Sequence, residues 1–343
     1  MNSLPSIFNG ISKNFNFTVS VAPMMDWTDR HCRWFHRKLS KNALLYTEMV
    51  VADAIIYGDK DFLISYNPEE HPVALQLGGS DPKKLSQAAK IGEKFGYDEI
   101  NINIGCPSDR VQSGRFGACL MNGGGGGGEC YSAMQNAVDV PVTVKCRLGI
   151  DEQNLSETLP NFISIVSESG CEHFIIHARK AWLNGLSPKE NRTVPPLQYS
   201  MVHEIKNQFS NLEIILNGGL KNIPDAKNNS LGLDGVMFGR SAYQDPWFLT
   251  EVDEKFYKGT QYSKSRYDLV EDLIQYAESK QENDRSTKSL VRHIMGLYAG
   301  QMGARTWRRA LSEGISSGLN PSSIIRRAAE EVNKANKFAQ SQS

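Results

Sequence analysis

The residues that could carry out chemistry stand at the ends of short, mostly apolar stretches. Lysine and arginine alternate with apolar residues from Val144 to Arg147, and a histidine and an arginine flank Ala178. A single polar residue in such a place is usually structural, but six stretches that end in this way predict a shared ligand site. The polar residues in question are Gln76, Asn101, Asn103, Lys145, Arg147, His177, Arg179, Asn217 and Arg240.

The last two of these stretches indicate the kind of ligand. Gly218 and Gly219 follow one stretch, and Gly239 and Arg240 follow the next. Glycines let the backbone come close to a ligand and present N–H groups, and arginine adds a planar cation. We therefore expect a phosphate group here, and Lys145 could reach a bound ring or anion.

Cys106 lies in the sequence Gly105-Cys106-Pro107-Ser108. Because Pro107 disfavours helical geometry at the residue before it, the thiol should lie at a bend, where it could act as nucleophile or acid. The other cysteines, with no Cys-x-x-Cys pair, predict buried thiols and no disulfide scaffold. Cys32 and His36 have helical i,i+4 spacing without a further ligand pair, so we expect no metal.

Eight short stretches rich in apolar and β-branched residues alternate with amphipathic segments such as 82–95 and 156–169. This alternation predicts a parallel sheet with crossover helices. Eight units in about 235 residues suit a (β/α)8 TIM barrel within residues 1–250 better than the alternative, a doubly wound sheet. The predicted strands are 17–24, 44–50, 72–79, 99–106, 141–149, 173–179, 213–219 and 235–240.

Beyond residue 250 the strand pattern stops. Segments 267–280, 287–300, 304–312 and 321–337 predict helices, which we assign to a small C-terminal helical domain over residues 255–335. Between Arg285 and Lys337 the sequence has ten basic and three acidic residues, although the whole chain balances 38 Lys and Arg against 38 Asp and Glu. Such asymmetry indicates a basic face that could bind nucleic acid, or simply a solvated helical surface.

The chain has 343 residues, of which 40% are hydrophobic, as expected for a globular protein. No apolar run reaches the roughly 18 residues of a membrane helix, and no signal peptide is evident. We expect a cytoplasmic monomer without a membrane partner.

Residues 123–128 are six consecutive glycines, placed where the helix after the fourth strand should begin. Glycine disfavours a helix by up to about 1 kcal/mol per position, so a flexible loop, a replaced segment or a sequence artefact is expected here. The run also matches G-x-G-x-x-G, but any polyglycine does, and we reject a dinucleotide site.

Together these residues resemble the tRNA-dihydrouridine synthases, over about residues 17–335. Residues 187–192 and 303–309 resemble the subfamily that acts on positions 20 and 20a of the D-loop. The glycine run is the evident departure. The matching motifs are residues 22–26 (APMMD), 46–49 (YTEM), 74–77 (ALQL), 103–108 (NIGCPS), 144–145 (VK), 176–179 (IHAR), 217–219 (NGG) and 239–240 (GR).

The resemblance implies a flavoprotein that reduces uridine to 5,6-dihydrouridine in tRNA, with NADPH or NADH as reductant. FMN would give hydride to C6 of a flipped-out uridine, and Cys106 would give a proton to C5. The residues implied for tRNA binding are Asn103, Lys189, Arg192, Arg305 and Arg308. Those implied for FMN are Pro23, Met24, Met25, Gln76, Lys145, His177, Asn217, Gly218, Gly219, Gly239 and Arg240.

Two other functions remain open from the residues alone. Another FMN barrel, reducing a small substrate such as dihydroorotate or an enone, explains the flavin site equally well but not the basic helical segment. A non-catalytic RNA-binding protein or RNA chaperone explains the basic segment but not the polar strand ends.

Overall fold

Eight parallel strands form a closed barrel in which each strand pairs with the next in sequence and β8 pairs with β1. The computed structural model describes residues 18–108, 114, 116–122, 125–280 and 287–340. The TIM barrel predicted from the alternation is therefore confirmed, and Phe17, predicted to open the first strand, lies outside the described residues. The strands are β1 (Thr18–Val21), β2 (Leu44–Val51), β3 (Val73–Gly78), β4 (Glu99–Ile104), β5 (Val142–Arg147), β6 (His173–His177), β7 (Glu213–Asn217) and β8 (Gly235–Phe238).

The strand register brings the polar strand ends to one level of the barrel. Asn103 of β4 pairs with Lys145 of β5, and Arg147 pairs with His177 of β6, which in turn pairs with Asn217 of β7. Because neighbouring parallel strands end on the same side, these side chains meet at the carboxyl-end rim. The isoleucines that alternate with the asparagines of β4 are buried and pack the helix layer against the sheet.

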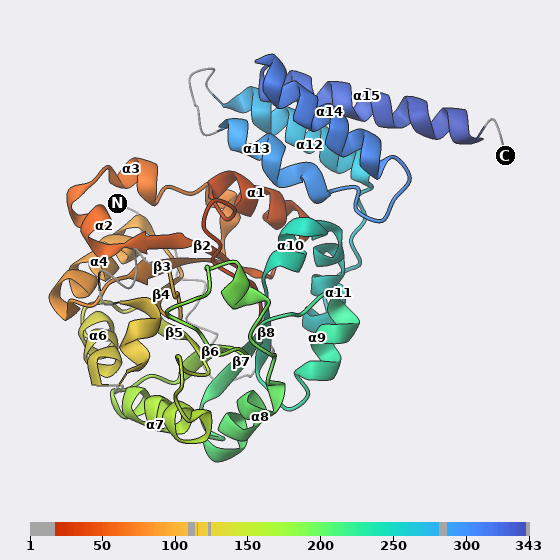
Figure 1. Cartoon of the computed structure of the whole chain (residues 1–343). Helices are drawn as coiled ribbons and strands as arrows, with labels where there is room; N and C mark the ends of the chain where they lie inside the picture. Colours follow the sequence, from red (N-terminus) through yellow and green to blue (C-terminus); the bar gives the residue numbers. More distant parts are fainter. Residues whose placement is uncertain (1–17, 109–113, 115, 123–124, 281–286, 341–343) are drawn as a thin grey trace.

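Helices surround the barrel, as Figure 1 shows in a view along its axis. The predicted helix over 82–95 is α4, whose cap is Asp81 as expected: its side chain accepts hydrogen bonds from the N–H groups of Lys83 and Lys84. The helices of this part are α1 (Arg30–Leu39), α2 (Ala52–Tyr57), α3 (Lys60–Leu63), α4 (Pro82–Phe95), α6 (Gly125–Gln135), α7 (Leu155–Glu168), α8 (Tyr199–Gln208), α9 (Ile223–Asn229), α10 (Arg240–Gln244) and α11 (Val252–Tyr257).

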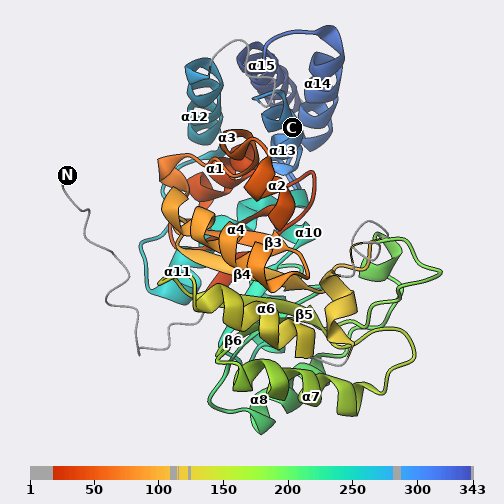
Figure 2. The same ribbon diagram turned by 90° about the vertical axis from the view of Figure 1, so that its left-hand side faces the viewer.

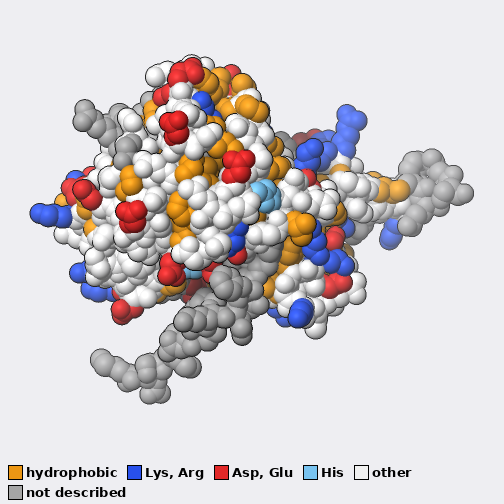
Figure 3. All heavy atoms as spheres, turned by 90° about the horizontal axis from the view of Figure 1, so that it is seen from below, with side chains coloured by type: hydrophobic (Ala, Val, Ile, Leu, Met, Phe, Trp, Pro, Cys, Tyr) orange, Lys and Arg blue, Asp and Glu red, His pale blue; other side chains and the backbone are white. Residues whose placement is uncertain are grey.

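The C-terminal helices pack together beside α1 (Figure 1). Figure 2 shows α14 on the side of the molecule toward which the long loop after β6 also projects. Seen from below, the C-terminal helical segment carries Lys and Arg side chains next to a few acidic ones (Figure 3). Its helices are α12 (Arg266–Ser279), α13 (Lys288–His293), α14 (Ala304–Ser317) and α15 (Pro321–Gln340).

The helix after β4 begins inside the glycine run, which corrects the expectation of a flexible loop for residues 125–128. Residues 125–128 are the first residues of α6; Gly123 and Gly124 lie outside the described residues. Gly127 is buried, and a Cβ there would lie 3.3 Å from Ile104 and Phe162. A Cβ on Gly128 would lie 2.5 Å from Oγ of Ser169. Close packing against β4 and α7 therefore overrides the low helix propensity of glycine.

The predicted helix over 287–300 is interrupted. The α-helix α13 ends at His293 and a 3-10 turn covers Ile294–Gly296. The carbonyl of Ile294 accepts a hydrogen bond from the indole of Trp307, and a Cβ on Gly296 would lie 2.6 Å from the carbonyl oxygen of Gln244. This tight contact with the segment after β8 explains why the helix does not continue.

Within the described residues, the helices include none with the length and apolarity that crossing a membrane requires. The same residues contain no group of three or more His, Cys, Asp or Glu side chains arranged to hold a metal ion. Cys32 and His36 contact each other at 3.7 Å between Sγ and Nε2, inside the protein.

Candidate active site

A cavity of about 1850 Å³ opens at the carboxyl ends of the strands. It brings together every residue predicted to bind the cofactor, which confirms that these residues share one place but leaves their roles as predictions. The predicted residues that line it are Pro23, Met24, Met25, Gln76, Asn103, Cys106, Lys145, His177, Arg192, Asn217, Gly218, Gly219, Gly239 and Arg240.

A chain of side-chain hydrogen bonds crosses β3, β4 and β5 beneath the cavity. Gln76 Nε2 donates to Asn101 Oδ1 at 2.7 Å, and Asn101 Nδ2 donates to Thr143 Oγ1 at 2.7 Å. Asn103 Nδ2 donates to Gln76 Oε1 at 2.8 Å. Each amide has two N–H groups, so Gln76 and Asn103 both keep one donor for a ligand.

Cys106 is held at the bend that the sequence predicts. Asn103 Oδ1 accepts the backbone N–H of Gly105 at 3.0 Å and that of Cys106 at 2.9 Å. Arg147 Nε donates to the carbonyl of Gly105 at 2.9 Å, and the Cys106 thiol lies 3.4 Å from the hydroxyl of Ser108. The half-buried thiol thus borders the cavity on a loop that Asn103 and Arg147 fix from two sides.

Lys145 and His177 lie among cations with little access to water. Burial, and then the charge of Arg147, lower the pKa of Lys145 from 10.5 to about 8. Burial, followed by the charges of Arg147 and Lys145, lowers the pKa of His177 well below its usual value. The His177 imidazole is therefore neutral near pH 7 and makes no hydrogen bond with the described residues, so it can offer a ligand one donor and one acceptor.

The ends of β7 and β8 form a cradle of backbone amides. Gly218 and Gly219 have φ values of 114° and 72°, and a Cβ on Gly218 would lie 2.5 Å from the His177 ring. Glycine is thus required at Gly218 both by conformation and by space. Among the described residues, the N–H groups of Gly218, Gly219 and Gly239 have no hydrogen-bond partner.

The donors of this cradle fit a phosphate group. Nε of Arg179 is buried without a hydrogen-bond partner among the described residues. Burial is the main cause of the lowered pKa values of Arg179 and Arg192, and repulsion by the positive charge of Arg240 lowers both further. A dianion placed among these groups would receive hydrogen bonds and relieve the repulsion.

Arg240 shares the cavity with further cations near the ends of β7 and β8. Arg179, Arg192 and Lys221 line the same cavity. The Arg240 guanidinium also donates a hydrogen bond to the backbone carbonyl of Arg192 at 3.0 Å. This contact joins the long loop after β6 to the start of α10, which the sequence spacing could not reveal.

Acidic side chains that were absent from the predicted site line the cavity at the ends of β1 and β2. Asp26 and Asp29 of the loop after β1 line it together with Glu48 of β2. Burial is the main cause of the raised pKa of Glu48, whose carboxylate accepts a hydrogen bond from the backbone N–H of Asp26. Asp26 and Glu48 lie in motifs noted in the sequence, but acidity alone did not mark them as site residues.

The residues predicted to bind RNA lie in separate places. Arg192 lines the cavity and is exposed, whereas Lys189 lies on the same loop away from the cavity wall. Arg305 and Arg308 are exposed on α14 and have no ion pair among the described residues, unlike Arg309, which pairs with Glu313 and Glu331.

The fold and this site define an α/β barrel with a cationic ligand cavity on its rim. Residues 20–334 match the family described as dihydrouridine synthase (Dus), and the chain belongs to this family of oxidoreductases. The resemblance seen in the sequence motifs is thereby confirmed.

Several relatives are similar to the chain over most of its length. It is 51% identical over 315 residues to the tRNA-dihydrouridine(20/20a) synthase of Vibrio vulnificus (strain CMCP6), covering 92% of this chain and 96% of that protein. It is 54% identical over 314 residues to the protein of the same name from Escherichia coli (strain K12), covering 91% of each.

Proposed function

We propose that this protein reduces uridine to 5,6-dihydrouridine at positions 20 and 20a of the tRNA D-loop, with FMN as cofactor and NADPH or NADH as reductant. One observation carries the proposal. The backbone amides at Gly218 and Gly219, the neutral His177 imidazole and the Cys106 thiol all line one cavity at the rim. The names of the relatives support the choice of tRNA and of the two positions.

In this proposal the FMN phosphate lies against the amides of Gly218, Gly219 and Gly239 and the guanidinium of Arg240. Lys145 and His177 face the ring system and the ribityl chain with their free donors and acceptors. Gln76 offers its remaining amide N–H, and Met24 and Met25 contribute apolar surface. The Lys145 ammonium donates a hydrogen bond to Oδ1 of Asn217 at 3.1 Å, and this contact holds the ammonium at the cavity.

When bound, the flavin supplies the hydride that C6 of the uridine accepts. Cys106 holds the proton that C5 requires, and its loop donates two backbone hydrogen bonds to Asn103 Oδ1, which keep the thiol at the cavity wall. Arg147 supports the Cys106 loop through the Gly105 carbonyl. It also donates to the carbonyls of Lys180 and Asn191, which belong to the long loop after β6.

We assign residues 1–250 to the catalytic barrel and residues 255–335 to a helical tRNA-binding domain. Lys189 and Arg192 would contact the RNA near the reacting base, and Arg305 and Arg308 would contact phosphates farther from it. A duplex would hide the uridine, so the base must leave its stack to reach the cavity.

The direct test is incubation of the purified protein with unmodified tRNA and NADPH, followed by mass spectrometry of the tRNA fragments. A gain of two hydrogens in the D-loop fragment is expected. The flavin absorbance of the purified protein tests the cofactor independently, because a small-molecule flavin reductase would contain FMN and leave the tRNA unchanged. A non-catalytic RNA-binding protein would contain no flavin.

A further inference from the structure

Asp26, in the loop after β1, has a left-handed backbone conformation with φ of 63°. It follows Met24 and Met25 along the cavity wall. Left-handed conformations are uncommon for residues other than glycine, although aspartate tolerates them better than most, and they persist where the surroundings hold them. The contacts of this residue therefore decide how the loop is shaped.

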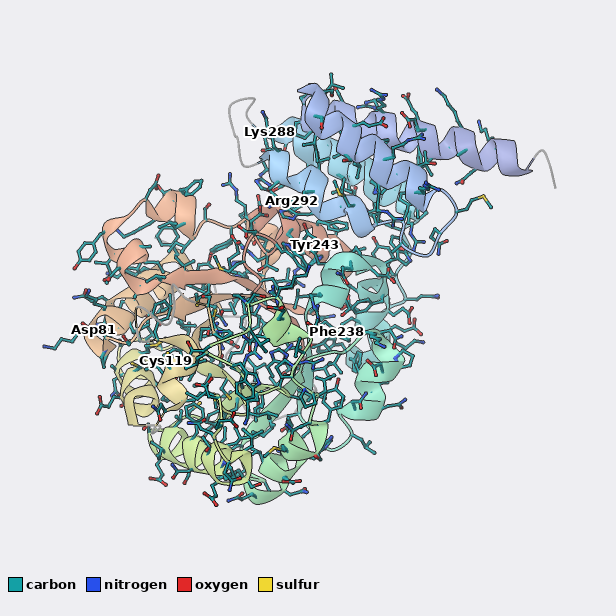
Figure 4. The ribbon with its side chains drawn as sticks, viewed as in Figure 1. Asp81, Cys119, Phe238, Tyr243, Lys288 and Arg292 are labelled. Carbon is teal, nitrogen blue, oxygen red and sulfur yellow. The ribbon has the colours of Figure 1, made fainter. Side chains whose placement is uncertain are left out.

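Two elements far apart in the sequence hold the peptide groups of Asp26. Its N–H donates to a carboxylate oxygen of Glu48 in β2. Its carbonyl accepts a hydrogen bond from Nη2 of Arg292 in α13 at 2.7 Å. Figure 4 shows Arg292 where the C-terminal helices meet the barrel, near Tyr243 of α10. One side of the turn is thus held by the barrel and the other by the helical segment.

The next residues of the loop are tied to the same helix. Oδ2 of Asp29 accepts hydrogen bonds from Ser289 Oγ at 2.6 Å and from His293 Nε2 at 2.9 Å. Oδ1 of the same carboxylate caps α1 by accepting the N–H groups of His31 and Cys32. Although burial alone would raise it, the pKa of Asp29 is lowered, chiefly by the hydrogen bond and charge of His293.

An aromatic stack supports the middle of the loop. Trp27 stacks on Tyr243 with ring centroids 4.2 Å apart, and the Tyr243 hydroxyl lies 3.0 Å from Nδ1 of His293. His293 is completely buried and contacts both Asp29 and Tyr243. The loop is therefore held at residue 26, at residue 27 and at residue 29 by groups linked to α13.

We infer that Arg292, together with Ser289 and His293, positions the loop that carries Met24 and Met25 against the flavin. This inference rests on the proposed FMN site and deepens it. Arg292 holds Asp26 in its left-handed turn, and the turn sets the direction in which the two methionines face the cavity. The C-terminal helices are thus a structural part of the cofactor site as well as a surface for RNA.

A simpler role for Arg292 is a contact with RNA phosphate, because its side chain is exposed. Lys288 lies one helical turn earlier on α13, is also exposed, and makes no hydrogen bond or ion pair with the barrel among the described residues. It provides a matched control, since removing either cation changes the charge of α13 equally. Only the loss of Arg292 should alter FMN binding in the absence of RNA.

The test compares Arg292→Met, Arg292→Lys and Lys288→Met in the full chain. FMN is removed, and its rebinding is followed by the quenching of flavin fluorescence; the absorption spectrum of the bound flavin is recorded without tRNA. For Arg292→Met we expect FMN binding roughly threefold to tenfold weaker and a changed flavin spectrum, as for the loss of one exposed charge-assisted hydrogen bond. Lysine should restore most of the affinity, and Lys288→Met should match the wild type.

Glycine at position 26 adopts the left-handed turn without strain, so Asp26→Gly should make Arg292 less necessary. The Arg292→Met change should then weaken FMN binding less in the Asp26→Gly protein than in the wild type. Wild-type FMN affinity and spectrum in Arg292→Met, or additive effects in the double variant, would overturn the inference. Absence of FMN binding by the wild type would instead contradict the proposed function, so the two failures are distinguishable.

Discussion

The ammonium group of Lys145 lies 3.1 Å from the amide oxygen of Asn217, and the amide nitrogen of Asn217 donates to the carbonyl of Met237 at 2.8 Å. Asn217 is thereby fixed between β8 and Lys145, and its oxygen directs the ammonium group into the cavity. No carboxylate forms an ion pair with Lys145 among the described residues. A bound ligand that accepts a hydrogen bond from this half-buried ammonium would stabilise its charged form.

The pKa of Lys145 predicts how FMN binding depends on pH. The value is lowered to about 8, so the free site loses this charge as the pH rises through 8. A bound anion favours the charged form, hence binding is linked to proton uptake and should weaken between about pH 7 and pH 9. Fluorescence titrations of the FMN-free protein at several pH values test this. In Lys145→Met the dependence should be much smaller; an equal dependence in both proteins would contradict the assignment.

Replacement of Cys106 by alanine should abolish uridine reduction while FMN content and flavin reduction by NADPH stay unchanged. Loss of a general acid lowers the rate by about 10²–10⁴-fold. Single-turnover reduction of tRNA by the prereduced enzyme gives this rate directly. Cys119→Ala is the matched control, because that thiol is also half-buried but does not line the cavity. Rapid tRNA reduction by Cys106→Ala would remove the cysteine from the mechanism.

Arg240→Ala should weaken FMN binding, because we propose that its guanidinium binds the FMN phosphate in the cavity that Gly218 and Gly219 also line. A charge-assisted hydrogen bond contributes about 1.5–3 kcal/mol, and we expect the lower part of this range because Arg179, Arg192 and Lys221 remain nearby. Flavin content after extensive dialysis, together with the dissociation constant, measures the effect. Unchanged flavin retention would place the phosphate elsewhere.

Two pairs of cations should bind tRNA, and the pair on α14, which lies outside the cavity lining, should do so without affecting FMN. The double variants Arg305→Ala/Arg308→Ala and Lys189→Ala/Arg192→Ala should bind tRNA more weakly. Each lost phosphate contact should also flatten the slope of log K against log salt by about 0.7–0.9. The second pair, beside the cavity, should also change which uridine is modified.

A third double variant controls for net charge in that experiment. Arg326 and Arg327 lie on α15 and are paired with Glu278 and Glu331. Their replacement by alanine removes as much charge as either test variant and should leave the salt dependence near that of the wild type. If all three double variants gave the same tRNA titration curves, the proposed RNA-binding surface would be wrong.

Alanine substitutions at Gly126 and Gly127 should differ in their effect on stability. At Gly126 a Cβ would have its nearest neighbour 3.6 Å away, so Gly126→Ala should stabilise the protein by about 0.5–1 kcal/mol. At buried Gly127 a Cβ would meet Ile104 and Phe162 at 3.3 Å, so Gly127→Ala should stabilise less or destabilise. Urea unfolding of both variants distinguishes them, and equal stabilisation would show that Gly127 is not needed for packing.

Local patterns in the sequence determined the barrel and most of its rim. The alternation of apolar strands with amphipathic helices has one simple solution, and the polar residue at each strand end must then face the same rim. This explains why residues as separate as Gln76 and Arg240 could be assigned to one cavity before its geometry was known.

Tertiary structure decided which of these groups are already paired and which are free. The sequence cannot show that Asn103 Oδ1 accepts hydrogen bonds from the Cys106 loop, or that Nε of Arg179 is buried without a partner among the described residues. It cannot show that a Cβ on Gly127 would lie only 3.3 Å from Ile104 and Phe162, or that a helix begins within a run of poor helix formers. Arg292 and Asp26 are 266 residues apart, and their hydrogen bond depends on how the C-terminal helices dock on α1. Such contacts arise from the packing of complete elements, and no local spacing records them.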